Sequence, residues 1–174
     1  MNSSAFRPLP MLYSISSEAM FDVSVTQQLI AAASATWPAT DLAIYYPFRL
    51  GAPLTITLLW CWNGTAVSGN VDIGVYAADG TRIVSAGTTA QAGTSALQSF
   101  NVTDTVIGPG DYYMALAFDN TTATVFRMNP AARILQGSGM LQQATAFALP
   151  ATATFAQSTN AFLPICGLST RSFL

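Results

Sequence analysis

Residues 41–127 consist of short segments in which every second residue is apolar, and most of these segments end at a turn signal. Successive side chains of a β-strand point to opposite faces of a sheet, so this alternation predicts strands with one face in a core. The turn signals are Gly51-Ala52-Pro53, Asn63-Gly64, Asp79-Gly80, Gly108-Pro109-Gly110 and Asp119-Asn120. Strands that recur every ~8–12 residues in this way are typical of an antiparallel β-sandwich of jelly-roll type.

The alternation also predicts which side chains face the core. The expected strands span residues 41–50, 54–62, 70–77, 81–86, 96–103, 111–119 and 122–128, with a loop or short outer strand at 87–95. The expected inward residues are Ile44, Tyr46, Phe48, Leu50, Leu54, Ile56, Leu58, Trp60, Trp62, Val71, Ile73, Val75, Phe100, Val102, Tyr112, Met114, Leu116 and Phe118. Pro47 lacks the amide hydrogen of a ladder residue, which predicts that its strand lies at a sheet edge or carries a bulge.

The two ends of the chain are expected to extend from this sandwich within a single domain of residues 1–174. Residues 1–40 are predicted to be an N-terminal arm, since Pro8 and its neighbours disfavour helix. Residues 128–174 are predicted to add strands and a C-terminal arm. Smaller elements are expected at 27–35 (helix or strand), 130–135 (a helical turn), 141–149 and 152–156 (strands). The tail, 158–174, is apolar, which predicts contacts outside the core of its own subunit, on this subunit or a neighbour.

The residue types present supply little catalytic chemistry. The chain has no histidine and no lysine, and 8% of its residues are charged, against ~25% in a typical soluble protein. It therefore lacks the commonest general base and metal ligand, and the amine for Schiff-base chemistry. Asp79, Asp104, Asp111 and Asp119 lie beside turn signals, where aspartate commonly accepts backbone hydrogen bonds, and Asp72 is expected at an outward strand position. We expect no enzymatic activity, no catalytic residue and no cofactor.

Calcium is the one metal that the composition leaves open. Its usual ligands are loop oxygens, and the candidates at strand ends are Asp104, Asp111, Asp119 and Asn120. The sequence contains no Asp-rich loop, so capping of turns is the favoured role and no metal site is predicted. A zinc site fails because two cysteines alone cannot complete four ligands.

The sequence shows no pattern typical of nucleic-acid binding, of a membrane span or of a signal peptide. The six arginines are dispersed, so no basic stripe for nucleic acid is expected. No apolar run approaches the ~20 residues of a membrane span, and the N-terminal residues lack the pattern of a signal peptide. Cys61 lies between two tryptophans in a strand pattern, which favours a buried free thiol. A disulfide between Cys61 and Cys166 stays open.

The aromatic residues allow two readings. Trp60 and Trp62 alternate with Leu54, Ile56 and Leu58, which is typical of a core face. The alternative is an exposed platform on which sugar rings stack. Its candidate members are Trp37, Tyr45, Tyr46, Trp60, Trp62, Tyr112 and Tyr113. The alternation favours the core.

The central stretch resembles small β-sandwich proteins encoded among the structural genes of tailed bacteriophages. The likeness is carried by AIYYPFRL (43–50), WCWNG (60–64), GNVDIGVYAADGTRIVSAGTTAQAGTS (69–95) and PGDYYMALAFDNTTATVFR (109–127). In such proteins a hairpin of the form GxY-xADG-TR and a strand of the form PGxYYLALA recur within one sandwich. The resemblance covers residues 41–127 and implies a virion component, such as a head decoration, head fibre, collar or tail accessory protein.

Apolar residues on both faces of strands 54–62 and 111–119 need to be covered, which predicts a homo-oligomer. The expected function is therefore that of a non-enzymatic structural component of a phage virion. It would associate with copies of itself and with other virion proteins, attached to the capsid or tail surface. The alternative is a carbohydrate-binding receptor module of a fibre or collar, with host glycans as ligands.

Overall fold

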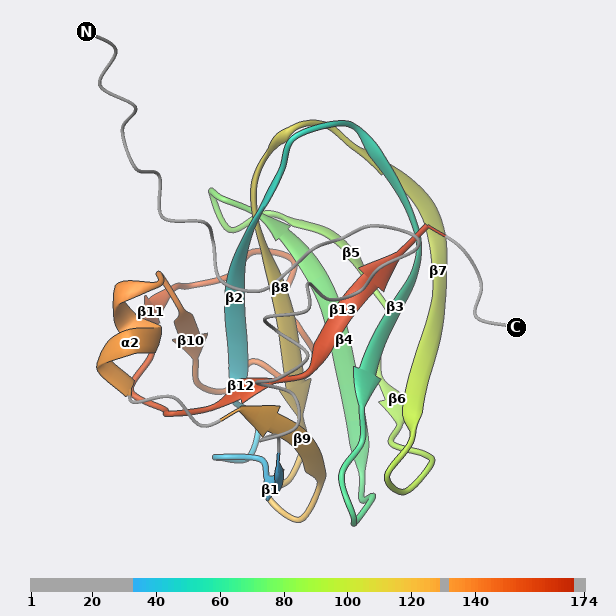
Figure 1. The fold of residues 1–174 in the computed structure, drawn as a ribbon, viewed down its shortest axis with the longest axis vertical. Coiled ribbons are helices and arrows are strands. Elements are labelled where there is room, and N and C mark those ends of the chain that lie inside the picture. Colours follow the sequence, from blue (N-terminus) through green and yellow to red (C-terminus); the bar gives the residue numbers. More distant parts are fainter. Residues whose placement is uncertain (1–32, 129–131, 171–174) are drawn as a thin grey trace, which may run out of the picture.

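Strands make up most of the computed structural model, which describes residues 33–128 and 132–170 (Figure 1). The larger sheet contains β2 (Ala43–Leu50), β4 (Asn70–Ala77), β5 (Arg82–Ser85), β6 (Thr89–Ala90), β8 (Gly110–Phe118), β10 (Leu141–Gln143) and β11 (Ala156–Gln157). The smaller sheet contains β3 (Leu54–Trp62), β7 (Leu97–Ile107) and β13 (Cys166–Ser169). A third sheet contains β1 (Ala33–Thr36), β9 (Thr124–Met128) and β12 (Leu163–Pro164).

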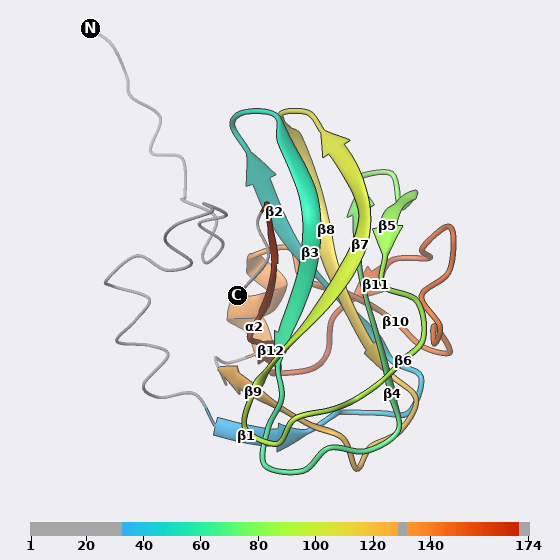
Figure 2. The same cartoon turned by 90° about the vertical axis from the view of Figure 1, so that its right-hand side faces the viewer.

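The two main sheets form an all-β sandwich, as predicted. The larger sheet has the order β11-β10-β2-β8-β4-β5, with β6 also paired to β4, and the smaller has the order β13-β3-β7. Seen from the side of β7, the smaller sheet lies in front of the larger one (Figure 2). Strand pairing in these sheets is antiparallel. The jelly-roll connectivity stays a prediction.

The main core lies between these sheets, and the predicted inward faces of β2, β4 and β8 are confirmed. Ile44 and Ile73 are both register partners of Leu116, so three fully buried side chains lie next to one another across three strands. Pro47 lies beyond the part of β2 that pairs with β10, which ends at Tyr45. Within the described chain its strand is therefore a sheet edge at that point, as predicted.

A second apolar layer covers the outer face of the larger sheet. Residues 144–155, the covering segment, pack against a cluster that includes Tyr45 and Tyr76. The predicted strands at 141–149 and 152–156 shrink to β10 and β11, because the backbone between them bonds to turns instead of a ladder. The Arg82 amide donates to the Ala151 carbonyl at 2.9 Å, and the Ala153 amide to the Gly80 carbonyl at 2.8 Å.

The two predicted terminal arms are not confirmed, because the described residues near both ends form strands that pack onto the sandwich. Residues 33–36 form β1, which pairs with β9, and Trp37 lies in the main core. In the tail, Phe162 and Leu168 are also core residues, and β13 is a full partner of β3. The apolar side chains of these terminal segments are therefore buried in the same core as those of the central strands. Residues 1–32 and 171–174, where the remaining arm predictions fall, lie outside the described residues.

Two turn signals had different outcomes. Asp79-Gly80 joins the paired strands β4 and β5, and Gly80 has a φ of 90°, which favours glycine. Asn63-Gly64 does not close a hairpin, because β3 and β4 belong to different sheets.

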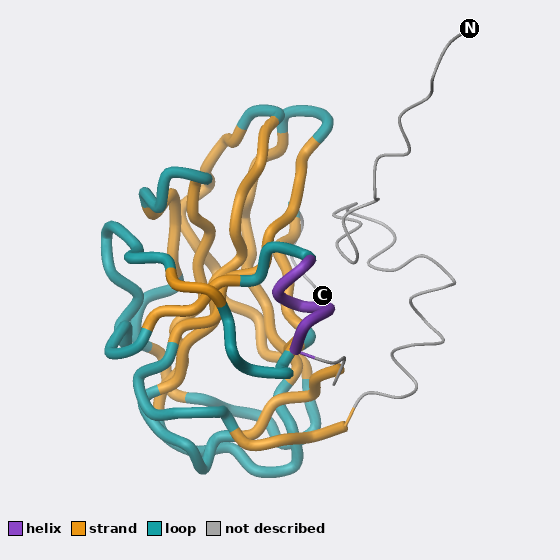
Figure 3. The backbone as a smooth tube through the Cα atoms, turned by 90° about the vertical axis from the view of Figure 1, so that its left-hand side faces the viewer, coloured by secondary structure: helices purple, strands orange, loops and turns teal. Residues whose placement is uncertain are grey.

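The predicted helical turn after residue 130 is α2 (Ala132–Gly137), which lies at the side of the sandwich (Figure 3). No helix in the described residues is long and apolar enough to cross a membrane.

Candidate functional site

The acidic residues that the structure describes are dispersed over several strands and turns. Asp79 accepts the Thr81 amide at 2.9 Å, which is the turn capping that its position predicts. Asp111 forms an exposed ion pair with Arg49 at 3.4 Å. Among the described residues no three His, Cys, Asp or Glu side chains are grouped as metal ligands would be.

The four candidate calcium ligands are not brought together. Asp119 and Asn120 are in contact, with 2.6 Å from Nδ2 of Asn120 to Oδ1 of Asp119. Asp111 lies near the start of β8, whereas Asp119 directly follows its end, so the length of an extended strand separates them. Asp119 instead accepts the amide of Asn70 at 2.9 Å and its side chain at 2.7 Å, so it ties β8 to β4.

Asp72 is the exception to this exposed pattern. It points away from the main core, as predicted, but it is fully buried because the covering segment lies over it. Its Oδ2 accepts the Leu149 amide at 3.0 Å. Burial raises the pKa of the Asp72 carboxyl, and the Leu149 amide, the Arg82 charge and the amides of Gly87 and Ile73 offset part of that rise.

Two tyrosines under the second layer bond the covering segment and the strand β10 that precedes it. The Tyr76 hydroxyl donates to the Pro150 carbonyl at 2.6 Å, and the Tyr45 hydroxyl donates to Oε1 of Gln143 at 3.1 Å. Their rings meet edge to face at 5.3 Å between centroids. Burial raises the pKa of Tyr45 to about 12 and raises that of Tyr76 as well. These buried groups anchor the covering segment to the outer face of the larger sheet.

The candidate sugar platform is not assembled. Trp37 and Tyr46 lie in the main core, whereas Tyr45 lies on the outer face of the larger sheet. Tyr112 packs against the main core and Tyr113 against the second layer, because consecutive residues of β8 face opposite ways. The remaining two candidates, Trp60 and Trp62, share one face of β3.

That face is the opposite of the one predicted. Ile56 points into the main core, but beyond it Leu59 and Cys61 are the core residues of β3. The change coincides with a shift of register against β7: Ile56 pairs with Thr105 and Leu58 with Asn101, so three residues of β7 lie opposite one residue of β3. The change of phase turns Trp60 and Trp62 to the outer face of the smaller sheet.

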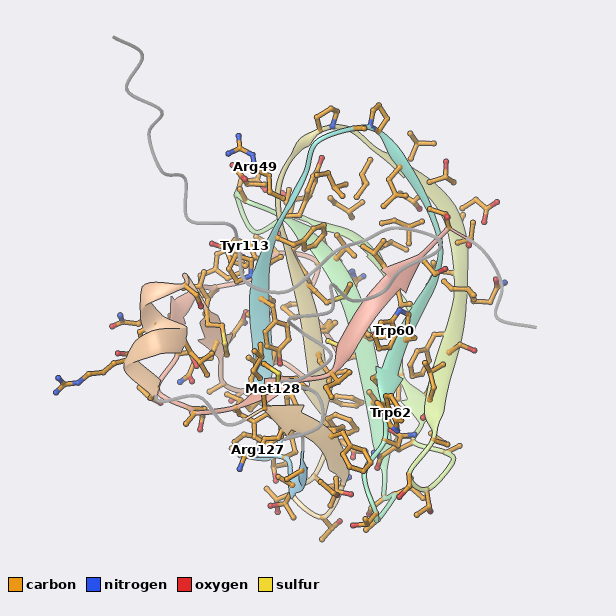
Figure 4. The ribbon with its side chains drawn as sticks, in the orientation of Figure 1. Arg49, Trp60, Trp62, Tyr113, Arg127 and Met128 are labelled. Carbon is orange, nitrogen blue, oxygen red and sulfur yellow. The ribbon has the colours of Figure 1, made fainter. Side chains whose placement is uncertain are left out.

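The two tryptophans differ in their surroundings, and Figure 4 shows them one after the other along β3. Trp60 is 4% exposed and lies over Gly167 of the neighbouring strand β13. Trp62 is 39% exposed, and its cross-strand partner Leu97 is 37% exposed. Phe126 of β9 contacts the Trp62 ring edge-on, with 5.9 Å between the centroids. We call Trp62 and Leu97 the apolar pair.

A buried polar cluster lies next to the apolar pair, and the sequence analysis missed it. Asn63 is fully buried, and its Nδ2 donates to the Ala92 carbonyl at 2.6 Å and to Oε1 of Gln98 at 2.9 Å. Gln91 Nε2 donates to Oδ1 of Asn63 at 3.0 Å and to the Thr124 carbonyl at 2.8 Å. The cluster fixes the chain after Trp62 to the loop before Leu97, and so it supports the apolar pair from behind.

Comparisons with protein-family models, with curated proteins and with solved structures each found no match. The fold and the side chains therefore define the class of protein as an all-β sandwich with a solvent-facing apolar pair on its smaller sheet.

Proposed function

We propose that the protein is a non-enzymatic structural component of a phage virion and that it associates with copies of itself through the apolar pair. The observation that carries this proposal is the partial exposure of Trp62 and Leu97, opposite each other on adjacent strands. A large indole beside a leucine on a rigid sheet is the kind of anchor that dominates protein interfaces.

The composition supports contact with protein over contact with charged ligands. With 8% charged residues, the chain has few groups that must be desolvated when a surface is covered. The apolar pair lies on a sheet face, and two such faces related by a two-fold axis can bury each other's tryptophan. Attachment to a capsid or tail surface, through other virion proteins, rests on the resemblance carried by residues 41–127.

Sedimentation velocity of the purified chain over a range of concentrations tests the association. We expect the wild type to form a discrete oligomer, and Trp62→Ser or Leu97→Ser to weaken association at least ~10-fold. Val106→Ser is the matched control, because Val106 is 72% exposed on the same sheet but pairs with Thr55 near the other end of β3. A wild type that stays monomeric throughout, or an equal loss in the control, would reject the apolar pair as the interface.

Carbohydrate binding is a second candidate, favoured by the outward position of the Trp62 ring. A partly exposed indole can stack on a sugar, and the residue would then serve a fibre or collar receptor module. In that case Trp62→Ala would abolish adsorption to host glycans while the oligomeric state stayed that of the wild type. The two functions are therefore separated by measuring association and glycan binding on the same variant.

A further inference from the structure

The two cysteines, distant in sequence, are direct neighbours across two strands. Cys61 of β3 is the register partner of Cys166 of β13. Both are free thiols, both are buried, and both face the main core. Two thiols paired across adjacent strands can form a disulfide if the separation of their Cα atoms is suitable.

The hydrogen bonds between β3 and the chain at β13 indicate the separation of the two Cα atoms. The Trp62 amide donates to the Ile165 carbonyl at 2.9 Å, so the pair next to the cysteines along the ladder is a hydrogen-bonded one. In antiparallel sheets such pairs alternate with non-hydrogen-bonded pairs, so Cys61 and Cys166 occupy a non-hydrogen-bonded position. There the Cα atoms are ~4.5 Å apart and the side chains are closest. A disulfide needs a Cα separation of ~4.4–6.8 Å.

We propose that Cys61 and Cys166 are a site of oxidative cross-linking, which clamps the C-terminal strand β13 to β3. With a disulfide oxidant such as oxidised glutathione, one cysteine thiolate attacks the reagent and releases one glutathione thiolate. The second cysteine thiolate then attacks the mixed disulfide and releases the other. The two cysteines lose two protons and two electrons in total, and one glutathione disulfide is reduced to two thiols.

The reaction needs β13 to open first. Burial raises the pKa of Cys61 to about 12 and that of Cys166 well above its usual value, so neither thiol is nucleophilic in the closed state. In the described part of the smaller sheet β13 is the outer strand, and it spans four residues. Its detachment exposes both sulfurs together, and its return brings them opposite each other.

The cross-link would stabilise the fold. It would join residues 105 positions apart (166 − 61), which removes much of the freedom of the unfolded chain. For a domain of this size we expect the melting temperature to rise by about 5–10 °C.

The test uses the intact chain in a glutathione redox buffer, with and without a low concentration of urea to promote opening of β13. Remaining thiols are then alkylated and the mass is measured. We expect both thiols to disappear together, a mass lower by two hydrogens, and a non-reduced peptide that joins Cys61 to Cys166. The melting temperature should rise, and a reductant should reverse the change.

Cys61→Ala and Cys166→Ala are the controls, and neither should show the rise in melting temperature on oxidation. The proposal is rejected if the wild type gives only mixed disulfides with glutathione or links between chains. It is also rejected if the internal cross-link forms and the melting temperature is unchanged or lower, since the paired geometry would then be strained.

Discussion

Gly167 lies directly opposite Trp60 across β13 and β3, so close that a Cβ atom on the glycine would be 2.6 Å from Cζ2 of the indole. The absence of a side chain at Gly167 lets the indole lie against β13. Gly167→Ala should therefore lower the free energy of unfolding by about 1–3 kcal/mol, the usual cost of overpacking.

Chemical denaturation monitored by tryptophan fluorescence checks this expectation. Gly108→Ala is the matched control, because a Cβ atom at Gly108 would meet nothing within 4 Å. Equal stability of the two variants would contradict the close packing of Trp60 on Gly167.

The buried carboxyl of Asp72 gives the stability a definite dependence on pH. Burial raises its pKa, so the folded chain holds this proton more tightly than the unfolded chain does. The contribution of Asp72 is then fully present below the unfolded pKa of ~3.9 and is lost as the pH rises through the raised folded pKa. Asp72→Asn cannot ionise and keeps an oxygen for the Leu149 amide. We expect it to gain stability relative to the wild type as the pH rises from about 4 to about 7.

Asp79→Asn is the control for this measurement, because the sign is opposite. The Thr81 amide and hydroxyl lower the pKa of the exposed Asp79 carboxyl. Its contribution is present above the unfolded pKa and is lost as the pH falls through the lowered value. Urea denaturation at several pH values should give slopes of opposite sign for the two variants, each relative to the wild type. The same slope for both variants would contradict a raised pKa of the buried Asp72 carboxyl.

The Tyr76 hydroxyl holds the covering segment through its bond to the Pro150 carbonyl. Tyr76→Phe leaves that carbonyl without this donor, so we expect a loss of about 1–2 kcal/mol in stability. Relative to the wild type, amide hydrogen exchange in the variant should also increase more in residues 144–155 than in the rest of the chain. Tyr112→Phe is the matched control, since its bond to the Gly108 carbonyl is exposed and should cost less. Uniform exchange rates in Tyr76→Phe would show that the segment is held by other contacts.

Asn63 is expected to be structural, even though its neighbour Trp62 is proposed to contact a second copy of the chain. Asn63→Ala removes a side chain that joins Gln91, Gln98 and the Ala92 carbonyl, and it leaves buried polar groups unsatisfied. A loss of about 1–3 kcal/mol in thermal or chemical unfolding should follow. The exposed Asn101 on β7 serves as the control, and Asn101→Ala should be close to neutral. If both variants unfold like the wild type, the cluster does not support the apolar pair.

The strand pattern was predictable wherever a strand keeps one phase along its length. In β8 the alternation places Leu116 in the main core and Ala115 in the second layer, as the sequence predicts. In β3 the same reasoning fails after Ile56, where the register with β7 shifts and the core residues become Leu59 and Cys61. Residues 58–62 are all apolar, so the alternation of β3 does not mark the position of this change.

The candidate site was harder to predict for a related reason. Asp72 was assigned to an outward position correctly, but its burial depends on a segment about 77 positions later in the chain, at Leu149. Asn-Gly favours positive φ, so the sequence predicts that Asn63 is a turn residue, whereas its side chain bonds Gln91 of a loop and Gln98 of β7. Local patterns identify such residues, and only long-range packing assigns their partners.

The melting temperature of Trp62→Ala, measured at low and at high protein concentration, tests self-association through the apolar pair most directly. Association stabilises the folded chain by mass action, so the wild-type melting temperature should rise with concentration. For Trp62→Ala we predict that this dependence disappears, while the value at low concentration falls only by the cost of the lost packing against Phe126. Trp60→Ala should instead lose about 3–5 kcal/mol at every concentration, as a buried aromatic does. A concentration dependence that survives in Trp62→Ala would contradict the assignment of the apolar pair as the surface through which the protein assembles.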